Sequence, residues 1–263
     1  MVLSVMRWVN YCCVLAFLGG YSVSAAEPQQ KSGLEMVFVG GGTFTMGGDD
    51  DFDDGGPPGS EDECPHLMTV SNFWIGKYEV TQADWMKFMG SNPSRFTNST
   101  ENPIEMVSWE DAQLFIRVLN GKSEKRFRLP TEAEWEFAAR GGGRKESFLY
   151  AGSDNANAVA WYEGNSGASS HPVGLLQPNG LGLYDMSGNI WEWCSDFKIP
   201  YPCDHFGKSF DPVSTPFPAR VLRGGTWSNR ASSVRVRDRN GRGNTLRLPT
   251  LGFRLAMDSN VPP

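Results

Sequence analysis

The chain has 263 residues, of which 40% are hydrophobic and 21% are charged, so enough apolar residues are present to exclude a disordered chain. The 30 glycines and 17 prolines are spread along the chain without a three-residue period, which excludes collagen and a bundle of long helices. The formal net charge of −6 is unevenly distributed: residues 49–63 contain eight acids and no base, whereas residues 220–254 contain nine arginines and one acid.

Residues 1–25 are predicted to be a secretory signal. A basic residue, Arg7, precedes the apolar stretch Val9–Leu18, which is too short to span a bilayer, and Val23-Ser24-Ala25 has the small residues of a cleavage site. A membrane anchor is the alternative. We therefore expect an exported protein, periplasmic or extracellular, with a polar leader over residues 26–34 and no membrane span after cleavage.

Three cysteines remain after the predicted cleavage, and their state is left open by the sequence. In an oxidising compartment Cys194 and Cys203, nine residues apart, are able to form a disulfide that would leave Cys64 free. Buried, inert thiols are the other possibility.

The first predicted elements are short strands. Residues 36–39 and 43–46 are apolar and β-rich on either side of a glycine turn, and residues 73–80 form another β-rich stretch. The acidic run over residues 49–63 is expected to be a solvated loop. It lacks the spaced Asp-x-Asp-x-Asp-Gly register that would favour a calcium loop.

Three short helices are predicted from capping signals. Thr81, Ser108 and Thr131 each precede an acidic residue three positions later, which is typical of a helix N-terminus. After Ser108, apolar residues follow the spacing of one helical face, namely Ala112, Phe115, Ile116 and Leu119.

The chain beyond Arg140 is predicted to consist mainly of loops. Strand-like runs return only at residues 190–193, 221–223 and 252–255. No internal repeat is present, so the sequence predicts one loop-rich α+β domain.

Seven motifs in this order resemble the formylglycine-generating enzyme (sulfatase-modifying factor) family. They are Gly41-Gly42-Thr43-Phe44-Thr45-Met46-Gly47, Lys77-Tyr78-Glu79-Val80-Thr81, Val107-Ser108-Trp109-Glu110-Asp111-Ala112, Arg128-Leu129-Pro130-Thr131-Glu132-Ala133-Glu134-Trp135-Glu136, Gly182-Leu183-Tyr184-Asp185-Met186-Ser187-Gly188-Asn189-Ile190-Trp191-Glu192-Trp193, Leu222-Arg223-Gly224-Gly225-Thr226-Trp227 and Gly252-Phe253-Arg254. The resemblance covers residues 35–257, leaving 258–263 as a tail. It implies a variant of the C-type lectin fold with little regular secondary structure.

The resemblance also implies a test for copper chemistry. Active members of this family oxidise a sulfatase cysteine with copper held by two cysteines, and the matching positions in this chain are Asn229 and Val234. Thiolates select Cu(I), and neither an amide nor an isopropyl group replaces them. We therefore expect no copper, no classical oxidase activity and no confident catalytic residue, unless Cys194 or Cys203 reaches the same site.

A calcium site is implied by the same resemblance. The matching positions are Asp185 and Glu192 through their side chains and Gly188 and Ile190 through their carbonyl groups, and Ca²⁺ prefers such oxygen ligands. Alternatively, the two acids cap turns or pair with arginine. The family's upstream calcium site is not expected, because the stretch around residues 159–161 lacks the family's asparagine.

The arginine-rich segment matches the wall of the family's substrate groove, over residues 227–251. Its candidate binding residues are Trp227, Asn229, Arg230, Arg235, Arg237 and Arg239. Arginine binds carboxylates and phosphates through two parallel hydrogen bonds. Pairing with acids of the same fold is the alternative for each arginine. The segment also resembles the variable region of diversified lectin-fold proteins.

These observations lead to two expected functions. The first is an exported protein that binds a peptide, protein or small-molecule ligand in the groove of residues 227–251. The second is a periplasmic oxidoreductase or maturation enzyme, acting on a sulfatase or oxidising a siderophore-like small molecule. Nucleic acid is not expected as a partner, because the net charge is negative and no nucleic-acid motif is present.

Overall fold

The computed structural model describes residues 31–48, 63–143, 147–202 and 219–259. The predicted signal, most of the acidic run and Cys203 lie outside these residues. The predicted leader does not end where the sequence suggested. Lys31 donates through Nζ to the carbonyl oxygens of Val173 and Gly174, and the Gly33 amide donates to Asp84, so the packed domain begins before residue 35.

The first sheet unites the two ends of the described chain. It has the order β1 (Met36–Val39), β4 (Phe73–Gly76), β12 (Ala256–Asp258) and β5 (Phe127–Arg128), with all pairs antiparallel. Val39 lies opposite Phe73 and Ile75 lies opposite Ala256, and all four side chains are buried. Residues 252–255 were predicted as a strand, but Gly252 ends the short strand β11 (Leu251–Gly252) and residues 253–255 connect β11 to β12. Asp258, predicted as tail, ends β12.

The second sheet carries the arginine-rich segment. Its order is β10 (Arg239–Gly243), β9 (Ala219–Arg223), β8 (Trp191–Phe197) and β11 (Leu251–Gly252), with only β8 and β11 parallel. Two smaller sheets pair β2 (Gly42–Met46) with β3 (His66–Val70) and β6 (Ala160–Trp161) with β7 (Ser187–Gly188). The predicted glycine turn therefore joins strands of different sheets.

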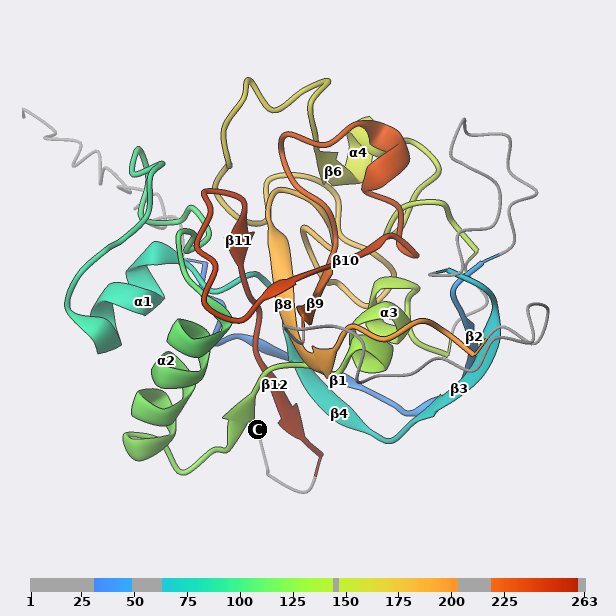
Figure 1. Ribbon diagram of the computed structural model, residues 1–263, viewed down its shortest axis with the longest axis horizontal. Coiled ribbons are helices and arrows are strands. Elements are labelled where there is room, and N and C mark those ends of the chain that lie inside the picture. Colours follow the sequence, from blue (N-terminus) through green and yellow to red (C-terminus); the bar gives the residue numbers. More distant parts are fainter. Residues whose placement is uncertain (1–30, 49–62, 144–146, 203–218, 260–263) are drawn as a thin grey trace, which may run out of the picture.

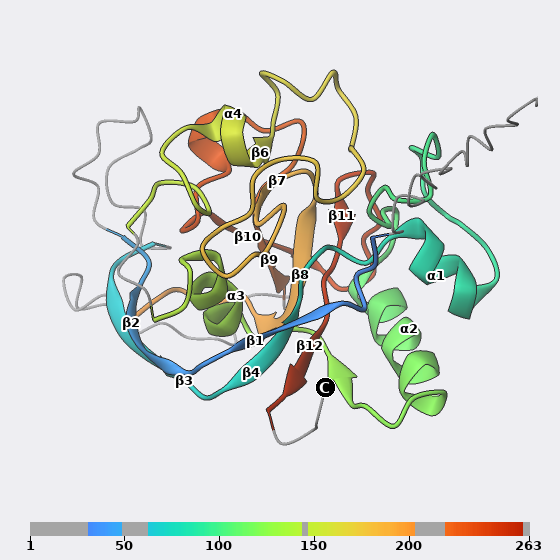
Figure 2. The same cartoon turned by 180° about the vertical axis from the view of Figure 1, so that it is seen from behind.

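The three predicted helices are confirmed, each with a capping box at the predicted residue. They are α1 (Gln82–Met89), α2 (Trp109–Gly121) and α3 (Glu132–Ala139), and the short α4 (Ala156–Val159) and the 3₁₀ helix η2 (Ala231–Ser233) follow. Helices α1 and α2 lie side by side on one flank (Figure 1), whereas α3 contacts both the β2–β3 pair and the β8–β9 strands. The view from behind shows β1 and β4 running from the side of β2 and β3 towards the side of α1 and α2 (Figure 2).

Two hydrophobic clusters form most of the core. One packs the predicted face of α2 with Trp85, Trp193 and Phe253, and the other surrounds Trp135 and Phe137 of α3. Within the described segments, no helix is both long and apolar enough to cross a membrane. The predicted fold class, a single loop-rich α+β domain, is confirmed.

Candidate functional site

Helix α3 holds the arginine-rich segment through acidic side chains. Arg239 donates to both oxygens of Glu132 at 2.8 Å, and Arg223 of β9 pairs with Glu136 where both side chains are fully buried. Removing a charge from water is costly unless it is paired, so these acids determine where the arginines lie. Internal pairing, the alternative for the arginines of residues 227–251, therefore holds for Arg239, and Arg223 just before that segment is paired in the same way.

A pocket of about 410 Å³ opens beside this ion-pair network, and we call it the Asn229 pocket. It is formed by the turn after β9, by η2 and by the start of β10. Its walls consist of Glu63, Trp191, Asn229, Arg230, Ser232, Ser233, Arg235, Asp238, Arg239 and Asn240. The pocket thus gathers four of the six predicted binding residues from the segment 227–251.

The arginines of the Asn229 pocket differ in how they are held. Arg235 is buried and donates to both oxygens of Asp238, through Nη2 at 2.5 Å to Oδ1 and through Nε at 3.2 Å to Oδ2. Arg239 is held by Glu132. Arg230 is exposed, and within the described part of the chain its guanidinium makes no hydrogen bond or ion pair. Only Arg230 among them presents a full set of donors to a ligand.

Asn229 is fixed by its backbone but not by its side chain. Its amide donates to the Thr226 carbonyl at 2.9 Å, and its own carbonyl accepts from the Glu163 amide at 2.8 Å. Its side-chain Oδ1 is buried and has no hydrogen-bond partner within the described part of the chain. Buried polar atoms are nearly always paired in folded proteins, so an unpaired oxygen on a residue of the pocket wall is unusual.

Val234, the second position matched to a family cysteine, lies in the core. It is fully buried in a cluster with Tyr150, Ala156 and Val159. Gly225 has φ of 79°, and a Cβ atom there would lie 2.6 Å from Val234 Cγ1. A glycine is required at residue 225 for this close approach. Asn229 therefore lines the pocket, whereas Val234 is not among its lining residues.

Two other predicted binding residues lie outside the walls of the Asn229 pocket. Trp227 donates its indole N–H to the Pro249 carbonyl at 3.2 Å and meets Phe96 edge to face. Arg237 is buried, and its Nε lies 3.4 Å from Glu63. Both residues support the segment that carries the pocket.

Glu63 and Trp191 line the pocket but were not predicted as site residues. Glu63, assigned from the sequence to a solvated loop, lies near Arg235 and Arg237, at 3.6 and 3.4 Å. Burial, and then the charge of Asp238, raises the pKa of its carboxyl. The contrast between an acidic front and an arginine-rich end was the signal for this pairing. No sequence signal placed Trp191 beside it.

The residues predicted to bind calcium lie in a buried ion-pair network. Arg254 donates to both oxygens of Glu192 at 2.6 and 2.7 Å, and the Trp135 indole donates to Glu192 at 2.7 Å. Asp185 accepts from the Gly174 amide at 2.7 Å. Burial raises the pKa of the Asp185 carboxyl to about 6.

This network does not fit calcium as it stands. The Glu192 oxygens that would bind the ion already accept from three N–H groups. Gly188 and Ile190, expected to contribute carbonyl oxygens, are buried. Pairing with arginine, the alternative for Glu192, is what the structure contains, and calcium binding stays a prediction to be tested.

The cysteines are not arranged as a Cys194–Cys203 disulfide. Cys194 is a free, fully buried thiol, whereas Cys64 is disulfide-bonded. Burial, and then nearby acidic residues, raises the pKa of Cys194 well above its ordinary value. Copper binds the thiolate, so Cys194 is a poor ligand. It is also absent from the walls of the Asn229 pocket.

Comparison with known proteins decides the family. The profile of the sulfatase-modifying factor enzyme 1-like domain matches residues 22–259. This chain belongs to that family. Other members of the sulfatase-modifying factor family are similar over most of the chain, and the predicted resemblance is confirmed.

Two relatives and one solved structure illustrate the similarity. A protein of Paenibacillus barcinonensis named chaperone protein LppX is 30% identical over 88% of this chain and 91% of its own length. The formylglycine-generating enzyme of Streptomyces coelicolor is 34% identical to this chain, and the match covers 72% of this chain and 62% of that enzyme. The structure of Treponema denticola variable protein 1 is 31% identical with a TM-score of 0.73, covering 85% of this chain and 94% of that one.

Proposed function

We propose that this chain is an exported binding protein of the sulfatase-modifying factor family, and that it binds an acidic peptide segment in the Asn229 pocket without copper-dependent cysteine oxidation. The observation that carries the proposal is the difference between its arginines. Acidic side chains hold Arg235 and Arg239 in the pocket wall, whereas the Arg230 guanidinium has no partner among the described residues. An exposed arginine of this kind on a pocket wall is suited to an anionic group.

The chemistry of the neighbouring atoms favours a peptide. A carboxylate at Arg230 would receive charge-assisted hydrogen bonds, and the unpaired Asn229 Oδ1 needs an N–H donor, which a peptide backbone supplies. Ser232 and Ser233 add hydroxyl groups to the same wall. The name of the Paenibacillus relative, a chaperone protein that matches this chain over nearly its whole length, supports a protein client.

An oxidoreductase is the second candidate, favoured by the similarity to the Streptomyces formylglycine-generating enzyme. Such an enzyme would act on a sulfatase cysteine or on a siderophore-like small molecule. It ranks second because Asn229 and Val234 stand at the copper-cysteine positions and burial raises the pKa of Cys194.

Fluorescence anisotropy with two matched peptide libraries tests the binding proposal. One library carries a central glutamate and the other a central glutamine, and we expect the glutamate peptides to bind about tenfold more tightly. Arg230→Ala should abolish that difference. Arg242→Ala is the matched control, because Arg242 is also exposed in this segment but lies outside the pocket.

Two results would overturn the proposal. Equal binding of both libraries would remove the role of Arg230. Stoichiometric Cu(I) binding under anaerobic conditions, followed by oxygen consumption with a cysteine peptide, would establish the oxidoreductase instead.

A further inference from the structure

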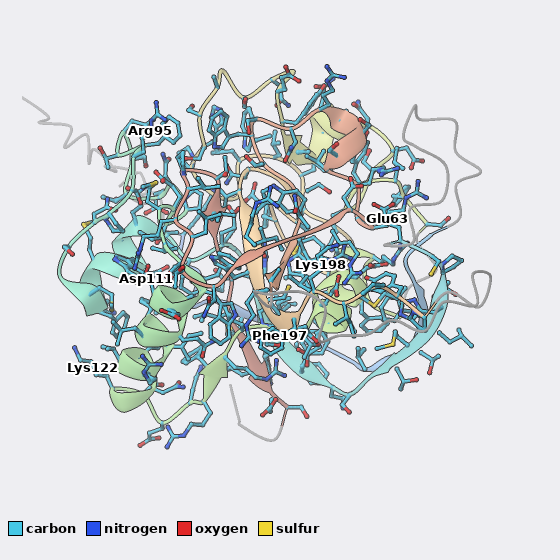
Figure 3. All side chains as sticks on the ribbon, viewed as in Figure 1. Glu63, Arg95, Asp111, Lys122, Phe197 and Lys198 are labelled. Atoms are coloured by element: carbon cyan, nitrogen blue, oxygen red, sulfur yellow. The ribbon has the colours of Figure 1, made fainter. Side chains whose placement is uncertain are left out.

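A second pocket lies between the end of α1 and the start of α2, and we call it the Trp85 pocket. Its volume is about 180 Å³, and its walls include Trp85, Met89, Pro93 and Met106, with Asp111 and Arg247 on its polar side. Figure 3 shows Asp111 on the flank opposite Glu63, which lines the Asn229 pocket. The two pockets share no residue, so they are independent sites.

Trp85 lines this pocket and carries an unpaired indole N–H. Its side chain is only 4% exposed and stacks on Phe115, with ring centroids 5.4 Å apart. Its indole Nε1 is buried and has no hydrogen-bond partner among the residues that the structure describes. The indole groups of Trp109 and Trp135, by contrast, each donate to an oxygen at 3.0 and 2.7 Å. A buried, unpaired N–H is rare in folded proteins and calls for an acceptor.

The pocket wall at Met106 is held in an unfavourable backbone conformation. Met106 has φ of 61°, which is uncommon for a residue with a side chain. Its amide donates to the Leu248 carbonyl at 3.0 Å, next to Arg247 in the chain. Strained backbone of this kind is concentrated at ligand sites. The hydrogen bond ties the apolar wall to the loop that carries the polar side.

The polar side of the pocket has no unbalanced charge. Arg247 donates through Nε and Nη2 to the two oxygens of Asp111, at 2.6 and 2.8 Å. Because Asp111 already neutralises the guanidinium, a second carboxylate gains little there. A neutral ligand avoids repulsion from Asp111 and still has an unpaired donor in Trp85.

We propose that the Trp85 pocket binds a small neutral ligand: one aromatic ring or branched aliphatic group that carries a carbonyl oxygen. The carbonyl oxygen accepts the Trp85 indole N–H, and the apolar group packs against Met89, Pro93 and Met106. The size follows from the volume, since a cavity of about 150 Å³ holds benzene. The site is separate from the peptide pocket and does not depend on the function proposed for it.

Nuclear magnetic resonance with three probes of similar size tests this site. Acetophenone supplies a ring and a neutral carbonyl, ethylbenzene lacks the oxygen, and benzoate replaces the carbonyl by a carboxylate. Titration with acetophenone should shift the indole N–H signal of Trp85, identified by its loss in Trp85→Phe, and leave that of Trp109 unmoved. Ethylbenzene should bind about tenfold more weakly, and benzoate no more tightly than acetophenone.

The variant Trp85→Phe keeps an aromatic ring against Phe115 but removes the donor. It should weaken acetophenone binding about five- to tenfold, followed at the Met89 amide, and leave ethylbenzene binding unchanged. If this variant does not fold, the three probes on the unaltered protein still decide.

Three results would overturn the proposal. The first is a Trp85 signal that does not move at ~10 mM acetophenone, a concentration that would detect even millimolar affinity. The second is equal affinity for acetophenone and ethylbenzene. The third is tighter binding of benzoate that Arg247→Met abolishes. The last result would make the site an anion site.

Discussion

Replacing Arg239 by methionine tests whether the ion pair between α3 and β10 stabilises the fold. The Arg239 side chain is 1% exposed and that of Glu132 is 8% exposed. Arg239 makes two hydrogen bonds to Glu132, donates to the Ile199 carbonyl at 2.9 Å and stacks on Tyr201 at 3.9 Å. Methionine retains a long apolar side chain and removes the charge.

The expected loss follows from what remains around Glu132. Without Arg239, the Glu132 carboxylate still accepts a hydrogen bond from the Tyr201 hydroxyl at 3.1 Å, and Arg223 Nε lies 3.7 Å away. Breaking a buried pair by removing one partner costs about 3–5 kcal/mol. We therefore expect the free energy of unfolding to fall by about that amount, a large share of the ~5–15 kcal/mol that stabilises a typical protein.

The matched control is Arg247→Met. Arg247 also makes two hydrogen bonds to one acid, Asp111, at 2.6 and 2.8 Å, but its side chain is 52% exposed. Exposed pairs contribute about 0–1 kcal/mol, because water competes for both ions.

Urea unfolding of the oxidised protein, followed by tryptophan fluorescence, measures both losses. Equal losses for the two variants would refute the claim that burial decides the stability of these pairs. The double variant Glu132→Gln/Arg239→Met should be more stable than the sum of the single losses predicts.

Three further predictions concern the region of residues 185–192. Burial raises the pKa of Asp185 from 3.8 to about 6, so the folded protein binds more protons than the unfolded chain between these values and its stability falls as pH rises through that window. Asp185→Asn should remove this part of the fall in urea titrations at about pH 4 and about pH 7; unchanged pH dependence would contradict the assignment. Gly188 has φ of 77°, and a Cβ atom there would lie 2.1 Å from the Trp161 carbonyl oxygen. Gly188→Ala should therefore cost about 2–4 kcal/mol of unfolding free energy, and a loss below about 1 kcal/mol would show that the backbone adapts. Because Arg254 already donates to both carboxylate oxygens of Glu192, millimolar calcium should leave the melting temperature unchanged in a thermal melt. A rise with calcium, reversed by chelation, would establish the calcium site implied by the family.

The sequence alone determined the elements that depend on neighbouring residues. Thr81, Ser108 and Thr131 cap their helices as predicted, because the capping contacts lie within one helical turn. The family motifs predicted the fold, because the family that they resemble has a known variant of the C-type lectin fold. The sequence also singled out the segment of residues 227–251, part of which lines the Asn229 pocket, and its role in binding stays a prediction.

Only the tertiary structure decided which side chains meet. Both Arg230 and Arg239 belong to the arginine-rich segment, yet Arg230 is exposed and has no partner in the described ranges, whereas Glu132, 107 residues away, holds Arg239. Partner choice over such separations depends on how α3 packs against the second sheet, and no local pattern encodes it. The same holds for Cys194, whose burial keeps it a free thiol, and for the unpaired indole of Trp85. Sequence therefore gives the list of candidate groups, and packing decides which of them a ligand can reach, because pairing and burial are properties of the assembled core.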